Sequence, residues 1–427
     1  MTYFRHSPLT LLFLCCSSLL PLNCHADYEA WLIELEDVLA AENIVDAERL
    51  LKEIPPAVRT DPSALLDSVR PHRLVYLEAY YGSLGGKKPP IRALVEPLLD
   101  RIVGSSTPKD GLRKAAYHAG PNSAIGVEAG NYGRIGVQDQ ALVSLGSPGE
   151  VMFERITTSG RALIAGISIN PQPSKFPVVA CSVGRGQAVL VGCTIQSRDG
   201  KATGFSTRKG SPRIAHCVTI NCSPGFISWS RSGMLVRDSS AKSGGGRGFV
   251  SAFRGIMVAE KCHAEGNLNS GFNSIGDSEM KLKQCVALKN KGYGYVASSR
   301  SRMVVEDSFA PQNGRHGFSS VGYAQMILDR CTAEKNGENG FTALGFASLV
   351  ATDCRAASNA GSGFGSYIAA EMVLFKCKAN FNEEAGYKAD KSRASNHAYA
   401  AILIRTSDCE VVMQDMDRAF VGDIMQR

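Results

Sequence analysis

Residues 271–293 read GFNSIGDSEMKLKQCVALKNKGY, and residues 294–316 read GYVASSRSRMVVEDSFAPQNGRH. Both stretches begin with glycine and an aromatic residue, and both then place methionine, a small thiol or hydroxyl, alanine and asparagine at the same offsets. The interval between equivalent residues is 23. A fixed interval of roughly 20 to 50 residues indicates a repeat protein in which each unit packs on the next.

The same interval continues along much of the chain. Glycine followed by Phe or Tyr recurs at residues 225, 248, 271, 294, 317, 340, 363 and 386. Nine residues later methionine is almost constant, as in Met234, Met257 and Met280. Three more columns are Ser239, Cys262, Cys285, Ser308, Cys331, Cys354 and Cys377; Ala241, Ala264, Ala287, Ala310, Ala333, Ala356 and Ala379; and Asn267, Asn290, Asn313, Asn336, Asn359 and Asn382.

The residues between these columns predict strands. The repeats have no long segment with helical periodicity, and they contain short runs such as MVV, MIL and LVA between Gly, Asn and Ser. We therefore predict an all-β fold, a right-handed parallel β-helix with coils of about 23 residues and three short strands in each. Equivalent residues of successive coils would lie about 4.8 Å apart, with the aromatic rings stacked inside and the asparagines at the corners.

The remainder of the chain predicts three further segments. Residues 1–26 have a basic start, an apolar run and small residues before a cleavage point after Ala26, which is typical of a signal peptide and predicts a secreted or periplasmic protein. Residues 27–105 show helical periodicity and contain 14 acidic and 9 basic residues, whereas the chain as a whole has a formal charge of +7. The β-helix is predicted over residues 106–395, and residues 396–427 form a C-terminal cap segment. No segment after the leader is long enough to span a membrane.

The first coils resemble a known superfamily. The sequence AGNY at residues 129–132, after DGLRKAAYHA and AIGVEA, is similar to the opening coil of the pectin-lyase-like right-handed β-helix proteins. The resemblance implies a fold rather than a reaction, because the superfamily includes polysaccharide lyases, hydrolases, epimerases, tailspikes and adhesins. The catalytic signatures of its epimerase, polygalacturonase and esterase branches are missing, and Arg315-His316-Gly317 is the nearest match to Gly-His-Gly. Catalysis is left open, and no catalytic residue is predicted.

One column indicates a binding surface. Six residues after each repeat glycine, at a predicted turn, the chain has Arg231, Arg254, Asp277, Arg300, Tyr323, Phe346 and Ala369. Guanidinium groups pair with carboxylates or sulfates, and exposed rings stack on sugars. Arg231, Arg254, Arg300, Tyr323 and Phe346 are therefore the predicted substrate-binding residues for an acidic polysaccharide. The alternative is a solvated turn with incidental arginines.

Two other columns carry structural predictions. Leu235, Val258, Val304, Ile327, Val350 and Val373 are the middle residues of apolar runs, so we expect them to face outward and to be covered by the helical module, by AYAAILI at residues 398–404, or by a second molecule. Asp238, Lys261, Gln284, Asp307, Arg330, Asp353 and Lys376 mostly alternate in sign and predict an ion ladder. The alternative for this region is a calcium site at Glu306, Asp307, Asp329 and Asp353.

The cysteines predict buried free thiols rather than a metal or disulfide framework. The chain has 13 cysteines, and a single row of them cannot surround a zinc ion or stack at the separation that a disulfide requires. A bridge among the less regular Cys181, Cys193, Cys217, Cys222 and Cys409 stays open. No metal, cofactor or nucleic-acid partner is predicted. The leading hypothesis is an exported protein that binds an acidic polysaccharide, with processing of that polysaccharide left open; the alternatives are a structural or adhesion protein, and a lyase, epimerase or glycoside hydrolase.

Overall fold

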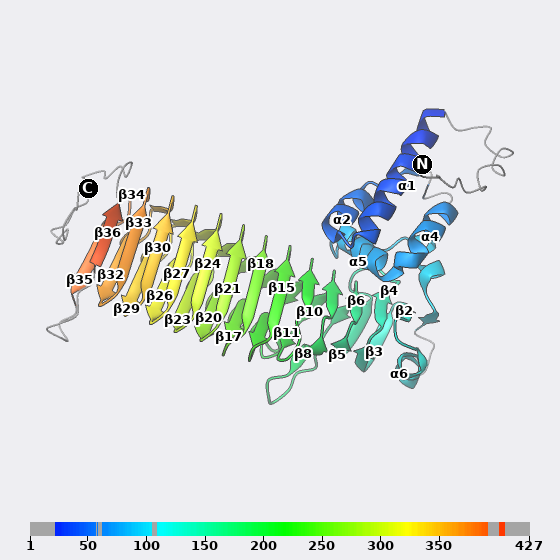
Figure 1. Ribbon diagram of the computed structural model, residues 1–427. Coiled ribbons are helices and arrows are strands. Elements are labelled where there is room, and N and C mark those ends of the chain that lie inside the picture. The colour runs from blue at the N-terminus through cyan, green and yellow to red at the C-terminus, as the bar shows by residue number, and fades with distance from the viewer. Residues whose placement is uncertain (1–21, 57, 59–61, 105–108, 392–400, 406–427) are drawn as a thin grey trace, which may run out of the picture.

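A rod of stacked parallel strands makes up most of the molecule, with helices beside its N-terminal end (Figure 1). This computed structural model describes residues 22–56, 58, 62–104, 109–391 and 401–405. Residues 1–21 of the predicted signal peptide and most of the predicted C-terminal cap lie outside these residues, while residues 22–26 of the predicted leader form the first turn of a helix that runs on to Ala40. The parallel β-solenoid predicted from the 23-residue interval is confirmed.

The N-terminal segment is helical as far as Leu98, as the periodicity predicts. Residues 101–103 of the predicted module are instead a strand of the solenoid, and one further helix, residues 109–118, lies within the range predicted as β-helix. The helices are α1 (Leu22–Ala40), α2 (Ile44–Lys52), α4 (Ser63–Val69), η1 (Arg70–His72), α5 (Arg73–Leu84), η2 (Arg92–Leu94), η3 (Glu96–Leu98) and α6 (Lys109–His118). Helix α5 ends at Gly85, whose φ of 60° lies in the left-handed region that glycine adopts without steric cost. Helix α4 has Pro62 at its N-cap, without a side-chain hydrogen bond there.

From residue 163 onward each coil contains three strands, and each kind of strand pairs with its own kind in the next coil. In the two coils before it, one long strand takes the place of the third and first strands, so that residues 151–160 pair with both 168–169 and 179–186. The first strands are β3 (Gly130–Gln138), β5 (Val151–Gly160), β8 (Val179–Gly186), β11 (Thr203–Thr207), β14 (Phe226–Trp229), β17 (Phe249–Ala252), β20 (Phe272–Gly276), β23 (Tyr295–Ser299), β26 (Phe318–Gly322), β29 (Phe341–Gly345), β32 (Phe364–Ile368) and β35 (Tyr387–Lys391).

The second strands form a sheet of their own. They are β1 (Arg101–Val103), β2 (Ala124–Val127), β4 (Ala141–Ser144), β6 (Leu163–Ala165), β9 (Val189–Val191), β12 (Arg213–Ala215), β15 (Gly233–Arg237), β18 (Ile256–Glu260), β21 (Glu279–Lys283), β24 (Arg302–Glu306), β27 (Gln325–Asp329), β30 (Ser348–Thr352), β33 (Glu371–Phe375) and β36 (Ala401–Arg405).

The third strands are shorter. They are β7 (Ser168–Ile169), β10 (Thr194–Gln196), β13 (Val218–Ile220), β16 (Ser240–Lys242), β19 (His263–Glu265), β22 (Val286–Leu288), β25 (Phe309–Pro311), β28 (Thr332–Glu334), β31 (Arg355–Ala357) and β34 (Lys378–Asn380). The register keeps equivalent residues together, since Met257 pairs with Met280 and Ala264 with Ala287. The sequence columns are therefore ladders in space.

Aromatic rings stack through the interior, as predicted. Phe226 and Phe249 are fully buried, and their ring centroids are 4.6 Å apart with an interplanar angle of 1°. The stack continues at 4.8 Å from Phe249 to Phe272 and at 4.9 Å from Phe272 to Tyr295. Each buried ring contributes roughly 1.5 to 3 kcal/mol through removal of apolar surface from water.

The asparagine ladder is also present, and it is buried. Asn290 Nδ2 donates to Asn313 Oδ1 over 3.0 Å, and the backbone N–H of Asn290 donates to the same oxygen over 3.1 Å. Asn290 Nδ2 also donates to the carbonyl of Ala264 in the preceding coil. Each side chain thus satisfies backbone groups at a corner where the chain leaves the strand.

The described cysteines are buried free thiols, which confirms the prediction for this part of the chain. They are Cys181, Cys193, Cys217, Cys222, Cys262, Cys285, Cys331, Cys354 and Cys377. Burial raises the pKa of the Cys222 thiol to about 12, so it stays protonated near neutral pH. Cys409, which the open disulfide alternative included, lies outside the described residues.

The column predicted as an ion ladder is mainly a column of turns. Asp238, Lys261, Gln284, Asp307, Arg330, Asp353 and Lys376 all have φ between 47° and 53°. Arg330 Nε lies 2.6 Å from Asp307 Oδ1, but no ion pair joins the other neighbours among these seven described residues. The ladder is therefore confirmed at one step only. No group of three His, Cys, Asp or Glu side chains in the described ranges is arranged to hold a metal, which gives no support to the calcium alternative.

The outer apolar column faces outward, and neither of the two segments of this chain that were predicted as its cover lies over it; cover by a second molecule stays a prediction. Leu235 is 51% exposed and Ile327 36%. The helical module packs on earlier coils of the same sheet, where Tyr81 and Leu77 share a hydrophobic cluster with Val143 and Leu163. Residues 401–404 of AYAAILI belong to β36, which pairs with β33 and extends the sheet, while residues 398–400 lie outside the described ranges. Neither segment covers the column.

A buried carboxylate joins the helical module to the solenoid. Glu48 on α2 is 4% exposed, and it accepts hydrogen bonds from Arg237 Nη2 over 2.6 Å and lies 3.2 Å from His216 Nε2. On helix α5, the Glu78 carboxylate accepts a hydrogen bond from Arg213 Nη2 over 2.8 Å. Two successive coils, one with Arg213 and His216 and the next with Arg237, therefore bind the module through polar and charged side chains, in addition to the shared apolar cluster.

Candidate functional site

The predicted binding residues lie at the turn after the first strands, on one edge of the rod. Arg231, Arg254 and Arg300 are exposed there, and they line a shared depression of about 480 Å³. Arg231 and Arg254 have φ of 64° and 72°, so the turn holds them in a left-handed conformation that points the side chains away from the strands. We call this row, from Arg231 to Phe346, the arginine edge.

Asp277 interrupts the row of positive charges. Its carboxylate accepts a 3.1 Å hydrogen bond from Arg300 Nε and lies 3.8 Å from Arg254 Nε. Its side chain is 45% exposed, so these are solvent-screened pairs of modest strength. Three arginines facing one carboxylate leave the depression with a net positive charge.

The aromatic half of the arginine edge follows in the next two coils. Tyr323 and Phe346 are 64% and 59% exposed. Their rings stack with centroids 5.2 Å apart at an interplanar angle of 8°. Two exposed, stacked rings form a surface on which the faces of sugar rings can pack.

The sequence columns missed three residues of the same edge. Trp229 and Phe253 stack with ring centroids 5.6 Å apart, and Arg208 lies over the Trp229 ring at 5.9 Å. Phe253 also lines the depression beside Arg254. Trp229 and Phe253 are 24 residues apart, one residue out of step with the 23-residue interval, so a search by column does not bring them together.

A second polar cluster, also missed, lies at the opposite end of the first strands. Arg315 Nε and His316 Nε2 are 3.1 Å and 3.0 Å from the two carboxylate oxygens of Glu338. The Arg315 guanidinium stacks over Tyr293 at 4.8 Å. His316 Nδ1 accepts a 3.1 Å hydrogen bond from the backbone N–H of Asn339, so the proton of the neutral ring lies on Nε2 and is donated to Glu338.

Burial keeps this imidazole neutral. Removal from water lowers the pKa of His316 to about 4. The negative charge of Glu338 raises this pKa and the positive charge of Arg315 lowers it, but burial has the largest effect. Because both ring nitrogens already make hydrogen bonds, His316 positions the Glu338 carboxylate and is not a free base. The Glu338 side chain is 39% exposed and presents its remaining acceptor positions to solvent.

No helix within the described ranges has the length and apolar character needed to cross a bilayer.

Comparison with known proteins identifies the family. The model described as "Right handed beta helix region" matches residues 179–325 and 262–403, which together span more than half of the chain. No curated protein matches the sequence.

Solved structures share the architecture at low identity. The catalytic unit of the GH87 α-1,3-glucanase from Streptomyces thermodiastaticus aligns with a TM-score of 0.58 and 12% identity, over 71% of this chain and 66% of that one. The periplasmic alginate epimerase AlgG aligns with a TM-score of 0.47 and 12% identity, over 72% and 82%. The A-module of the mannuronan C-5 epimerase AlgE4 from Azotobacter vinelandii gives 0.38 and 16%, over 68% and 80%. The chain thus spans about two thirds of the length of the glucanase structure. Because the family model matches residues 179–403, which is more than half of the chain, this chain belongs to the right-handed β-helix family.

Proposed function

We propose that this protein binds an acidic polysaccharide along the arginine edge. The observation that carries the proposal is the convergence of Arg231, Arg254 and Arg300 on one depression, with the stacked rings of Tyr323 and Phe346 in the adjoining coils. Arginine pairs with carboxylates and sulfates through two parallel N–H groups, and rings pack on sugar faces. Export through the leader at residues 1–26 is part of the same proposal.

The spacing of the edge suits a polymer. Stacked rings of successive coils have centroids 4.6 Å apart in the interior and 5.2 Å apart on the edge, close to the roughly 4.8 Å spacing of neighbouring strands. A chain lying along the edge can therefore make the same kind of contact again in each coil, so that several weak, solvent-screened pairs add up. The same fold serves an α-1,3-glucanase, and for this chain processing of the bound polymer is a further part of the proposal.

The test compares two triple variants of equal charge. Arg231→Ser, Arg254→Ser and Arg300→Ser are combined in one variant; Lys281→Ser, Lys283→Ser and Arg302→Ser, which lie on the outer face of the second sheet, form the control. Retention on pectate, alginate and heparin columns is measured at low salt and over a salt gradient. We expect the arginine-edge variant to lose retention and the control to keep most of it. Equal retention by both variants would contradict the proposal.

A further inference from the structure

A second depression lies where the first strands begin, rather than where they end. Its volume is about 400 Å³, which is within the roughly 300 to 1,000 Å³ of small-molecule sites. The lining residues that matter come from four segments: Asn131 and Tyr132 from β3, Glu154 from β5, Asn170 and Gln172 after β7, and Arg198 after β10. We call it the amide cleft.

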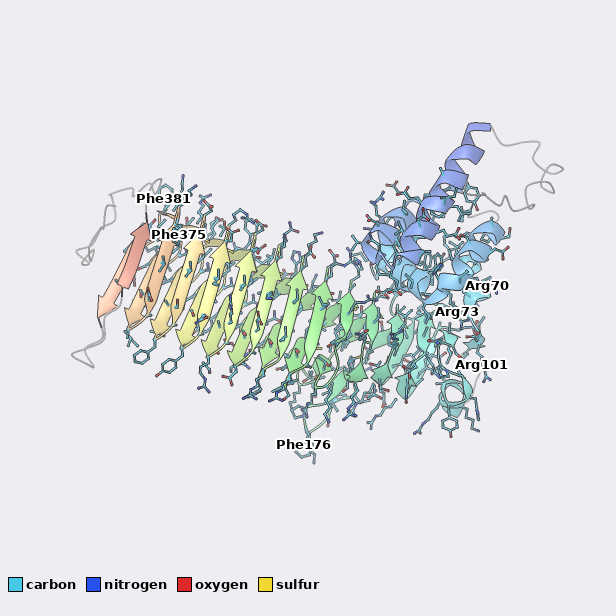
Figure 2. All side chains as sticks on the ribbon, in the orientation of Figure 1. Arg70, Arg73, Arg101, Phe176, Phe375 and Phe381 are labelled. Atoms are coloured by element: carbon cyan, nitrogen blue, oxygen red, sulfur yellow. The ribbon has the colours of Figure 1, made fainter. Side chains whose placement is uncertain are left out.

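A protruding loop forms one wall of the amide cleft. The segment between β7 and β8 leaves the solenoid beside β5 (Figure 1), and Phe176 lies on the part that projects farthest (Figure 2). Phe176 is 77% exposed. The loop begins at Asn170, whose backbone N–H is fixed by a 2.7 Å hydrogen bond to the Phe153 carbonyl. The cleft and the arginine edge are therefore formed by different coils and by opposite ends of the first strands.

The carboxamides in the amide cleft have unused hydrogen-bonding capacity. Asn170 Nδ2 has a single acceptor, the Met152 sulfur at 3.4 Å, which is a weak one. The side chains of Asn131 and Gln172 make no hydrogen bond to other described residues. Each carboxamide offers two N–H donors and a carbonyl acceptor, so together they match a ligand whose groups both donate and accept, such as neighbouring hydroxyls.

The amide cleft has one charged group that is free to pair with an anion. Glu154 is paired with Arg134, whose Nε lies 3.3 Å from its carboxylate. Arg198 is exposed and has no ionic partner among the described residues, so its guanidinium is available to a ligand carboxylate. Tyr132 is half-buried in the wall, where its ring stacks on Phe153 at 5.2 Å and adds apolar surface.

We propose that the amide cleft binds a single uronic acid unit, with Asn131, Asn170 and Gln172 on its hydroxyls and Arg198 on its carboxylate. This site goes beyond the arginine edge because it needs neither a polymer nor any residue of that edge. It would hold a free sugar acid or the end of a chain.

The test uses the full chain with three named probes: sodium D-galacturonate, sodium D-glucuronate and methyl β-D-glucopyranoside. Binding is titrated by ligand-observed saturation-transfer NMR. We expect both sugar acids to bind more tightly than the neutral glycoside. Arg198→Ser should weaken binding of the acids about tenfold, as loss of a charged hydrogen bond does, and leave the neutral glycoside unchanged.

Two further variants and one control separate the possible outcomes. Asn170→Ala combined with Gln172→Ala should weaken all three probes, and Arg355→Ser, an exposed arginine on β31, should weaken none. The triple variant of Arg231, Arg254 and Arg300 should bind the probes like the wild type, even if it has lost polymer retention. Absence of binding to the wild type, equal effects of Arg198→Ser and Arg355→Ser, or loss of the probes in the arginine-edge triple variant would each overturn the proposal.

Discussion

Asp277 accepts a hydrogen bond from Arg300, the next residue in its column, and also lies beside Arg254 in the preceding coil. The carboxylate thus partly neutralises the surface that we propose binds anions. Asp277→Asn keeps the size of the side chain and removes its charge. We expect this variant to elute from acidic polysaccharide at higher salt than the wild type, because two arginines lose a competing partner. The control is Asp238→Asn, which removes a carboxylate at a turn after strand β15. Equal shifts for Asp277→Asn and Asp238→Asn would contradict a local effect.

The exposed ring pair supplies a second prediction. Tyr323→Ala combined with Phe346→Ala should weaken binding of long acidic oligosaccharides by several fold, because stacking contributes about 0.5 to 1.5 kcal/mol for an aromatic pair. The salt dependence should stay unchanged, since no charge is removed. Phe309→Ala combined with Phe381→Ala removes two exposed rings from elsewhere on the rod. Affinity measured by isothermal titration calorimetry should not change in that control.

Asn313 is expected to be important for stability. Its Oδ1 accepts from both the N–H and the Nδ2 of Asn290, and its Nδ2 donates to the Ala287 carbonyl. Asn313→Ala leaves these buried groups without partners, and each costs about 1 to 3 kcal/mol. The measurement is the midpoint of urea unfolding, followed by circular dichroism. We expect a clear fall of this midpoint for Asn313→Ala and a small one for the control Asn269→Ala, which changes an exposed asparagine two coils earlier. Similar midpoints would show that the ladder is dispensable.

Glu48 should hold the helical module in place. Removing one partner of a buried ionic group leaves the others uncompensated, which costs about 3 to 5 kcal/mol. In Glu48→Ala, Arg237 and His216 keep their positions on the solenoid but lose their acceptor. We expect faster amide hydrogen exchange in α2 and α5, with the later coils unchanged. Glu53→Ala, an exposed residue just after α2, is the matched control; unchanged exchange in Glu48→Ala would show that the apolar cluster alone fixes the module.

His316 predicts a dependence of stability on pH. Its pKa in the folded protein is about 4, below the usual 6.5, so the unfolded chain takes up the proton first as the pH falls. The stability that the neutral imidazole contributes is therefore complete above about pH 6.5 and decreases toward pH 4, by an amount on the order of 3 kcal/mol. His316→Asn should flatten this part of the pH profile of unfolding midpoints. An unchanged slope between pH 6.5 and 4 would contradict the prediction.

The sequence was sufficient for the fold because each coil repeats the same physical solution. In each column a residue stacks on a like residue of the next coil, so the interval in the sequence predicts which residues are in contact. Examples are Phe249, Met257, Cys262, Ala264 and Asn267. The outward direction of Leu235 also follows from strand alternation alone. These predictions need only the interval and the two faces of a strand.

Contacts outside the repeat were not predictable in this way. Glu48 and Arg237 are 189 residues apart, and one of them lies in a helical segment without a repeat. Trp229 and Phe253 are out of step by one residue, and the amide cleft belongs to early coils whose lengths are irregular. Site residues of this kind depend on how unlike segments meet, and a single sequence has no periodic signal for that.

The in-register stacking has a consequence for how such a molecule changes in size. Removal of one whole repeat, such as residues 271–293, would bring Gly294 onto Gly248 with every ladder still continuous, and would shorten the rod by about 4.8 Å. Duplication of a repeat would lengthen it by the same step. One repeat of 23 residues corresponds to 69 nucleotides of coding sequence. Loss or gain of coding sequence in multiples of 69 nucleotides would therefore change the length of the rod and leave the structure of its two ends unchanged.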